Sequence, residues 1–394
     1  MLLVFLLLYA GVSLALDLKS AINSAIENSP YIKGLPSEGL IYEGKRLSYR
    51  SGLNPSLSVE AGNFGTSKEG FSKAPIYGIT YTQPLSYPAL FRSAGEVYRL
   101  QSIALQHRIE SEKNRLAQDV YLLFYQALYT KELLKVAEEE LRLQREIRDF
   151  VERSFRLGET TRLELLRAQR ELELLEGDRR LVESKYRALL GELSTLTDRD
   201  VMDVEGELSL PQWAHMDLEE TPLFAYYRAG IQSLSKQMEV ERVLSKPSYS
   251  VSITAEKVAD REYGLRAGLV VNLPLLYRRQ GEMLELMAQQ NLLSAEAETQ
   301  KQKALAQLRS AKTQFEQIRR EVEKIEKELL PEAQKELELA IKSYKLRTIT
   351  LLELSQTRRS YYELLKRRLE LMLQAHTEYA KGITYGGSKW CGCY

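Results

Sequence analysis

Residues 155–169 read FRLGETTRLELLRAQ, and residues 344–358 read YKLRTITLLELSQTR, 189 positions further along the chain. In the first stretch, Gly158 can take the left-handed conformation that ends a helix. Thr161 can then cap the next helix, and Glu164 three residues later completes a Thr-x-x-Glu capping box. The stretch therefore predicts a tight helix–turn–helix and not a flaw within one long helix.

The second stretch keeps the capping box as Thr350 and Glu353, but Arg347 stands where the first stretch has its glycine. A left-handed conformation costs a residue with a side chain about 1 kcal/mol or more. We therefore expect the second turn to be strained or to be built differently from the first.

The segments before the two turns have the composition of very long helices. Residues 85–157 contain one proline, Pro88 near the start, and residues 275–346 contain only Pro331. At 1.5 Å per residue, each segment would form a rod of roughly 110 Å. In the second segment, apolar residues recur at steps of three and four, as in a coiled-coil seam. These seam positions are Leu305, Leu308, Ala311, Phe315, Ile318, Val322, Ile325 and Leu329.

The two turns belong to a duplication of the whole chain. Three further pairs of motifs recur in the same order, at offsets of 190 to 192 residues. They are Asn28-Ser29-Pro30-Tyr31 with Glu220-Thr221-Pro222-Leu223, Pro55-Ser56-Leu57-Ser58-Val59 with Pro247-Ser248-Tyr249-Ser250-Val251, and Gln83-Pro84-Leu85 with Leu273-Pro274-Leu275. Each half therefore reads as a short helix, two strands, a proline, a very long helix, a break and a second helix.

Each half contributes one predicted β-hairpin. In the second half, Tyr249, Val251, Ile253 and Ala255 alternate with hydroxyl-bearing residues, and the return strand from Tyr263 to Leu273 alternates in the same way. This pattern gives one apolar and one polar face over about ten residues, which is the length of a tilted membrane strand. A soluble antiparallel sheet with its apolar face on a core would show the same alternation.

The N-terminal sequence MLLVFLLLYAGVSLA is an apolar run that ends in small residues, as a secretory signal peptide does, and it is shorter than a membrane-spanning helix. We expect a signal peptide at 1–15, a first repeat at 16–203, a linker at 204–221, a second repeat at 222–382 and a flexible tail at 383–394. The first repeat would hold a hairpin at about 55–84 and long helices at about 85–198; the second, a hairpin at about 247–273 and long helices at about 275–382.

No later segment is apolar enough to span a bilayer as a helix, so only the strands could place this chain in a membrane. Four strands cannot close a barrel, since small barrels need about eight. Several chains would have to pool their strands. Two copies would give eight strands in a barrel mostly filled by side chains, whereas three would give twelve, enough for a passage.

The composition offers little material for catalysis. The chain has 55 basic and 54 acidic residues, so it lacks the excess of positive charge that is typical of nucleic-acid-binding proteins. Its three histidines are far apart, and Cys391 and Cys393 stand at the extreme end without other ligands nearby. Metal-site spacings are absent. We expect no enzyme, no cofactor and no metal site.

Taken in order, these motifs resemble the TolC family of outer-membrane efflux proteins (outer membrane factors) across essentially the whole mature chain. The residues that carry the resemblance are the Pro-Ser-x-Ser-Val strand starts at Pro55 and Pro247, the Pro-Leu strand exits at Pro84 and Pro274, the segment Leu329-Leu330-Pro331-Glu332-Ala333, and the paired motifs Phe155-Arg156-Leu157-Gly158 and Tyr344-Lys345-Leu346-Arg347 with the leucine-rich runs that follow them.

The resemblance implies an α+β membrane protein, a homotrimer whose twelve-stranded transmembrane β-barrel, four strands per chain, continues into a long α-helical coiled-coil barrel. The barrel would sit in the lipid of the outer membrane and the helical tunnel in the periplasm. The partners would be a periplasmic adaptor (membrane fusion) protein and, through it, an inner-membrane transporter. The implied function is the passive duct of a tripartite efflux or type I secretion system. The cargo stays open among drugs, metal ions and proteins.

By position, the two turns inherit the family's adaptor-docking role. The residues are Leu157, Gly158, Glu159, Thr160 and Thr161 in the first turn, and Leu346, Arg347, Thr348, Ile349 and Thr350 in the second, with Glu164 and Glu353 as capping residues. Arg347 departs from the family, which usually has glycine there; one hypothesis is a charge matched to an acidic adaptor. The alternative to the duct is a soluble periplasmic coiled-coil adaptor or scaffold, which would not need two hairpins of this kind.

Overall fold

The computed structural model describes residues 15–63, 75–85, 87–258 and 263–387. The chain divides into two units: unit 1 comprises the described parts of Met1–Lys33, Glu110–Thr221 and Gln302–Tyr394, and unit 2 comprises those of Gly34–Ile109 and Pro222–Lys301. Residues 1–14 of the expected signal peptide, Cys391 and Cys393, and most of the loop between the first two hairpin strands lie outside the described residues.

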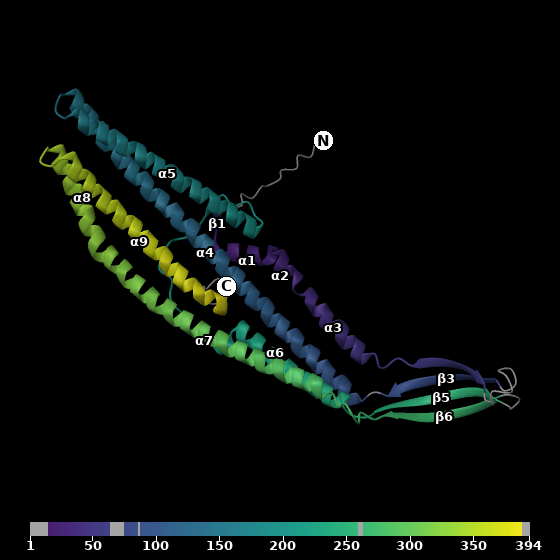
Figure 1. Ribbon diagram of the computed structural model, residues 1–394. Coiled ribbons are helices and arrows are strands. Elements are labelled where there is room, and N and C mark those ends of the chain that lie inside the picture. Colours follow the sequence, from purple (N-terminus) through teal and green to yellow (C-terminus); the bar gives the residue numbers. More distant parts are fainter. Residues whose placement is uncertain (1–14, 64–74, 86, 259–262, 388–394) are drawn as a thin grey trace, which may run out of the picture. The chain divides into compact units, whose positions relative to one another are not determined.

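The elements follow the same order in both halves of the chain (Figure 1). The first half contains β1 (Ala15–Leu16), α1 (Leu18–Asn28), α2 (Pro30–Gly34), α3 (Ser37–Arg50), β2 (Ser56–Asn63), β3 (Pro75–Leu85), α4 (Pro88–Arg156) and α5 (Arg162–Thr197). The second contains β4 (Asp203–Val204), a 3-10 turn (Leu218–Glu220), α6 (Pro222–Leu244), β5 (Ser248–Val258), β6 (Tyr263–Asn272), α7 (Gln280–Lys324), a π-helical turn (Ile325–Leu329), α8 (Leu330–Lys345) and α9 (Leu351–Gly386).

The two hairpins of unit 2 join into one antiparallel sheet, with strand order β2-β3-β5-β6. Alternation places the apolar residues on one face, including Val59, Ile79, Ile253 and Leu265, each about half exposed or more. The opposite face carries mainly serine, threonine and glycine, together with Glu60, Glu256 and Arg266. The sheet therefore has the two chemically distinct faces that the sequence predicts, and nothing within the described chain covers the apolar one.

The helical seam predicted for the second half is correct over most of its length, with one error. Ala304 is fully buried in α7, whereas Leu305 is 47% exposed. With Ala304 in place of Leu305, the seam steps by four and three without exception as far as Leu329. None of the helices in the described ranges combines the length and the apolarity needed to cross a bilayer.

Pro331 does not interrupt the helical path. The chain passes from α7 through a π-helical turn into α8, in which Pro331 is the second residue. The Leu330 N–H donates to the carbonyl of Ile325, five residues back. Because proline lacks an N–H and crowds the carbonyl four residues before it, this wider turn accommodates the ring without a break.

The last helix ends later than the sequence indicates. It runs to Gly386, and Ile383 and Tyr385 in the segment expected to be a flexible tail are buried. At the other end, Ala15 and Leu16 pair in parallel with Asp203 and Val204. The start of the described chain is therefore joined to the segment between the two halves.

A buried histidine fixes that connecting segment to the core of unit 1. His376 on α9 is 1% exposed and stacks on Tyr125, with ring centroids 3.5 Å apart. Its Nδ1 lies 2.7 Å from the hydroxyl of Tyr121, and its Nε2 lies 2.8 Å from the carbonyl oxygen of Ser209. Since a carbonyl can only accept, Nε2 carries the proton and Nδ1 accepts from Tyr121.

This burial makes the stability of unit 1 sensitive to acid. Desolvation lowers the pKa of His376 from 6.5 to about 4 in the folded chain. Between these two pH values the unfolded chain therefore binds more protons than the folded chain. As the pH falls from 6.5 to 4, the free energy of unfolding decreases by about 3 kcal/mol at most. We expect denaturant unfolding of the wild type to become easier across this window. His376→Gln should flatten the dependence; an unchanged slope in this variant would contradict the assignment.

Candidate functional site: the paired helical turns

The first turn, between α4 and α5, is a Schellman motif. Gly158 has a φ of 72°. The N–H of Glu159 donates to the carbonyl of Ser154 at 2.8 Å, and that of Gly158 donates to the carbonyl of Phe155 at 2.9 Å. These two bonds satisfy the last carbonyls of α4 and turn the chain sharply toward α5.

The second turn, between α8 and α9, has the same hydrogen-bond pattern. Arg347 has a φ of 62°, so it takes the left-handed conformation that Gly158 takes in the first turn. Thr348 N–H donates to the Ser343 carbonyl and Arg347 N–H to the Tyr344 carbonyl, both at 2.9 Å. Of the two alternatives expected for this turn, strain or a different construction, the structure shows strain, because φ is positive at a residue with a side chain.

The caps of the following helices differ in one bond. Thr161 Oγ1 accepts from the Glu164 N–H at 3.2 Å, and Thr350 Oγ1 accepts from the Glu353 N–H at 3.3 Å. In the second turn Glu353 also accepts from the Thr350 N–H at 2.7 Å, which completes the capping box and holds the pKa of Glu353 below its usual value. In the first turn Glu164 instead accepts from the hydroxyl of Thr160, so the predicted reciprocal bond is absent there.

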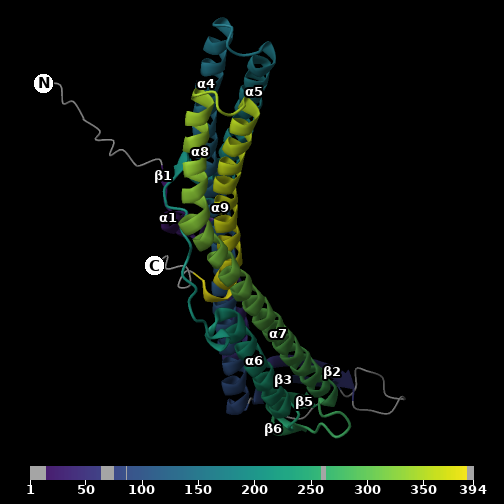
Figure 2. The same cartoon turned by 90° about the vertical axis from the view of Figure 1, so that its left-hand side faces the viewer.

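The two turns lie next to each other at one end of unit 1 (Figures 1 and 2). The guanidinium of Arg347 forms an ion pair with Glu159 of the first turn. Thus the residue that departs from the family pattern reaches across to the other hairpin, and part of its charge is matched within the chain.

Each turn presents the same exposed apolar residues to solvent. Leu157 and Leu346 are 73% and 76% exposed, and Leu163 and Leu352 are both 56% exposed. The members of each pair are separated by 189 residues, the offset of the duplication. Exposed leucines at equivalent places in two turns form a surface that could bind a partner twice in the same manner.

Of the remaining predicted residues, Ile349 turns inward and the hydroxyl of Thr348 donates to the carbonyl of Ser343 at 3.0 Å. Ile349 packs on a small core between the hairpins, whose buried members are Ile147, Val151, Ala168, Leu351 and Leu354. Tyr344 joins this core edge-on to Phe150, and burial together with the nearby charge of Glu164 raises the pKa of Tyr344 to about 12. Ile349 therefore supports the turn from within, whereas Thr348 stays exposed and its hydroxyl bond stabilises the turn.

Below this core, a buried arginine ties the two hairpins together. Arg358 on α9 has a side chain that is 2% exposed; it donates to the amide oxygen of Gln144 on α4 and lies 3.4 Å from Glu171 on α5. Glu171 also accepts from the hydroxyl of Ser355 at 3.0 Å and pairs with the exposed Arg359 at 2.8 Å. No sequence motif indicates this cluster, since its members are as far as 214 positions apart.

Replacing Arg347 with glycine is expected to change stability little. Glycine would relieve about 1 kcal/mol of backbone strain. It would also remove the pair with Glu159, which is exposed and worth at most about 1 kcal/mol. We expect the variant to unfold within about 1 kcal/mol of the wild type in a denaturant titration. A large loss of stability would show that the Arg347–Glu159 pair is the principal tie between the turns; Glu159→Gln, which keeps the strain, is the matched control.

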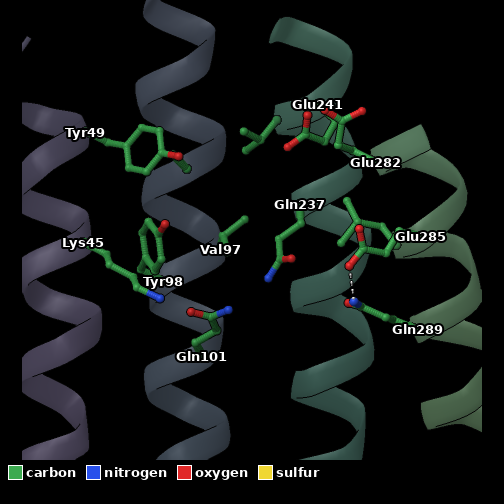
Figure 3. A pocket seen from close by; sticks show the side chains of 13 residues that line it. Lys45, Tyr49, Val97, Tyr98, Gln101, Gln237, Glu241, Glu282, Glu285 and Gln289 are labelled. Atoms are coloured by element: carbon green, nitrogen blue, oxygen red, sulfur yellow. Dashed lines mark hydrogen bonds between the residues drawn. The ribbon is translucent and has the colours of Figure 1, made fainter. Parts of the chain in front are cut away.

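The described part of unit 2 contains a polar pocket of about 340 Å³ between α3, α4, α6 and α7 (Figure 3). Tyr49 and Tyr98 stand on one side, with ring centroids 5.8 Å apart, and Glu241 and Glu282 on the other. Both carboxylates are paired with Arg279. No group of His, Cys, Asp and Glu side chains suited to a metal ion occurs in the described ranges.

No family model and no curated protein sequence matches this chain. Solved structures do match. The outer membrane protein VceC from Vibrio cholerae is 13% identical, with a TM-score of 0.75 over 95% of this chain and 96% of VceC. The open-state outer membrane channel MtrE of Neisseria gonorrhoeae is 17% identical, with a TM-score of 0.70 over 94% and 89%. The CmeC outer membrane channel of Campylobacter jejuni is 14% identical, with a TM-score of 0.70 over 94% and 85%. At these identities the likeness establishes the fold.

Proposed function

We propose that this chain, which has the fold of the TolC family of outer-membrane channels, forms the outer-membrane duct of a tripartite efflux or type I secretion system. Three copies would build a twelve-stranded barrel in the outer membrane and a helical tunnel in the periplasm. Conduction would be passive, with energy supplied by an inner-membrane transporter that reaches the duct through a periplasmic adaptor.

The observation that carries this proposal is the sheet of β2, β3, β5 and β6. Its apolar face is exposed in the described chain, and its two outer strands have unpaired edges. Such a sheet is stable in lipid only when its edges are paired, and four strands are too few to close on themselves. Pooling strands from three chains satisfies both requirements and leaves a lumen on the polar side.

The helices supply independent support for association between copies. Leu163, Leu166, Leu174 and Leu181 of α5 are each more than half exposed. At 100° per residue they fall on one side of the helix and form an apolar stripe. A stripe of this length is expected to be covered, and a neighbouring copy in a helical tunnel would cover it.

The experiment that tests the duct combines location with conductance. The full chain should fractionate with outer membranes, migrate as a trimer after cross-linking, and open water-filled channels in planar bilayers. Recovery of the chain as a soluble periplasmic protein would contradict the duct and favour the adaptor or scaffold alternative.

The turns are the proposed adaptor-docking surface, and their leucines provide a second test. The double variant Leu157→Asp, Leu346→Asp places charges on the two most prominent apolar side chains. We expect the double variant to capture at least tenfold less of the periplasmic adaptor than the wild type does. The reason is that burial of each leucine side chain contributes about 1.5–3 kcal/mol to binding.

The matched control is Leu40→Asp, since Leu40 on α3 is also 73% exposed but lies outside the turns. This variant should keep the adaptor. If the control and the double variant capture equal amounts of adaptor, the docking role of the turns is contradicted, whereas the proposal of a duct is not.

A further inference from the structure

The polar face of the sheet carries almost all of the charge in the strands. Among the described strand residues of the sheet, four side chains are charged: Glu60, Glu256, Lys257 and Arg266. The pairing register puts Glu60, Glu256 and Arg266 on the polar face and Lys257 on the apolar face. The three charges on the polar face are therefore gathered in one place, and the rest of this face is neutral.

The two carboxylates stand level with each other across the sheet. Glu60 pairs with Gly78, Gly78 with Glu256, and Glu256 with Gly264. A β-carbon at Gly78 would lie 4.0 Å from the Cβ of Glu60, and one at Gly264 would lie 3.8 Å from the Cγ of Glu256. The glycines therefore leave the space beside both carboxylates open.

The next row toward the helices carries one charged side chain, Arg266, and the rows beyond it are neutral. This next row consists of Ser58, Thr80, Thr254 and Arg266, and the hydroxyls of Thr80 and Thr254 lie 2.9 Å apart. Arg266 reaches back to Glu256, at 2.9 Å. Their charges cancel, so each chain contributes a net charge of −1 from Glu60 at this level of the sheet.

We propose that Glu60 and Glu256, balanced by Arg266, form a ring of charge in the lumen that makes the duct favour cations over anions; this inference rests on the proposed trimeric barrel. In such a barrel the apolar face meets lipid and the polar face lines the passage. Three chains then place a net charge of −3 on one ring. Rings of acidic side chains are a general means of selecting cations.

The dimensions make this ring effective at low salt only. Twelve strands about 4.8 Å apart, tilted by about 40°, give a backbone radius of about 12 Å. Glutamate side chains reach inward from that wall, so their charge acts near the axis when the Debye length is about 10 Å, at 0.1 M salt. At 1 M salt the Debye length is about 3 Å, and most of the lumen is screened.

The test is the K⁺/Cl⁻ permeability ratio of the full chain in planar bilayers under a KCl gradient. At 0.1 M the wild type should favour K⁺, and this preference should fade at 1 M. Glu60→Gln and Glu256→Gln should each lower the ratio at least about twofold, since either removes three negative charges from the ring. Arg266→Gln should raise the ratio by a similar factor.

Lys257→Gln is the matched control for Arg266→Gln. Both remove one positive charge per chain from neighbouring strands, β5 and β6, but on opposite faces of the sheet. Lys257→Gln should leave the ratio unchanged. If the wild type conducts and all four variants share its ratio, or if Lys257→Gln shifts the ratio as much as Arg266→Gln, the charge ring is overturned and the duct stands. A wild-type chain that never conducts overturns the duct, and the ring with it.

Discussion

Ile253→Arg is expected to abolish assembly of the chain in the outer membrane. Ile253 lies midway along β5, an inner strand of the sheet, on the exposed apolar face. An arginine facing lipid near the bilayer midplane costs about 2–4 kcal/mol, and a trimer would carry three, for a total on the order of 6–12 kcal/mol. This cost is comparable to the whole stability of a typical domain.

The measurement is the amount of cross-linked trimer in outer-membrane fractions, normalised to total expressed chain. Ser252→Arg is the matched control, because Ser252 is the adjacent residue and points to the polar face, opposite Gly268. The control should assemble, since its side chain enters water in the lumen. If both variants assemble equally well, the apolar face does not meet lipid, and the barrel is contradicted.

Arg358→Ala is expected to loosen the end of unit 1 that carries the turns. The change deletes a buried guanidinium, leaves the amide oxygen of Gln144 without its donor, and leaves Glu171, whose side chain is 13% exposed, with one cation fewer. Removing one partner of a buried, hydrogen-bonded ion pair costs about 3–5 kcal/mol. Because Arg359 still pairs with Glu171, we expect a loss of about 3 kcal/mol.

Arg359→Ala is the control for this variant. Arg359 is the next residue and pairs with the same carboxylate, but its side chain is 57% exposed, so its loss should cost less than about 1 kcal/mol. Amide hydrogen exchange of the full chain would detect the difference as faster exchange in α5 and α9 for Arg358→Ala alone. Equal effects of the two substitutions would show that burial does not govern the strength of this cluster.

The turns illustrate how far local sequence determines structure. Their hydrogen bonds join residues no more than five positions apart, so Gly158 and Thr161 could be assigned to a helix end and a helix cap without knowledge of the rest of the chain. The exception was Arg347. The preference of its backbone argued for a turn that is either strained or built differently. Which of the two occurs became clear only from the structure, in which Arg347 has a positive φ and pairs with Glu159 of the other turn.

In the strands, too, local sequence predicts some features and leaves others undetermined. Alternation along the chain was sufficient to predict an apolar and a polar face, because side chains on a strand point to opposite sides in turn. That Glu60 and Glu256 lie in the same row of the sheet was not predictable, since it depends on the pairing of β3 with β5 from two different hairpins. The registers of four strands had to be known before the charged row could be recognised.

Local sequence specifies the two-faced strands, the long helices and the capped turns, because each follows from short-range periodicity or from residues within one turn of helix. The duplication is visible because four motifs recur in the same order 189 to 192 residues apart. Long-range packing determines that Ala304 and not Leu305 enters the seam, that His376 is buried against Tyr121, and that Arg358 joins α4, α5 and α9. Those outcomes depend on which surfaces meet, and the contacts join residues hundreds of positions apart, where no local pattern carries information about the partner.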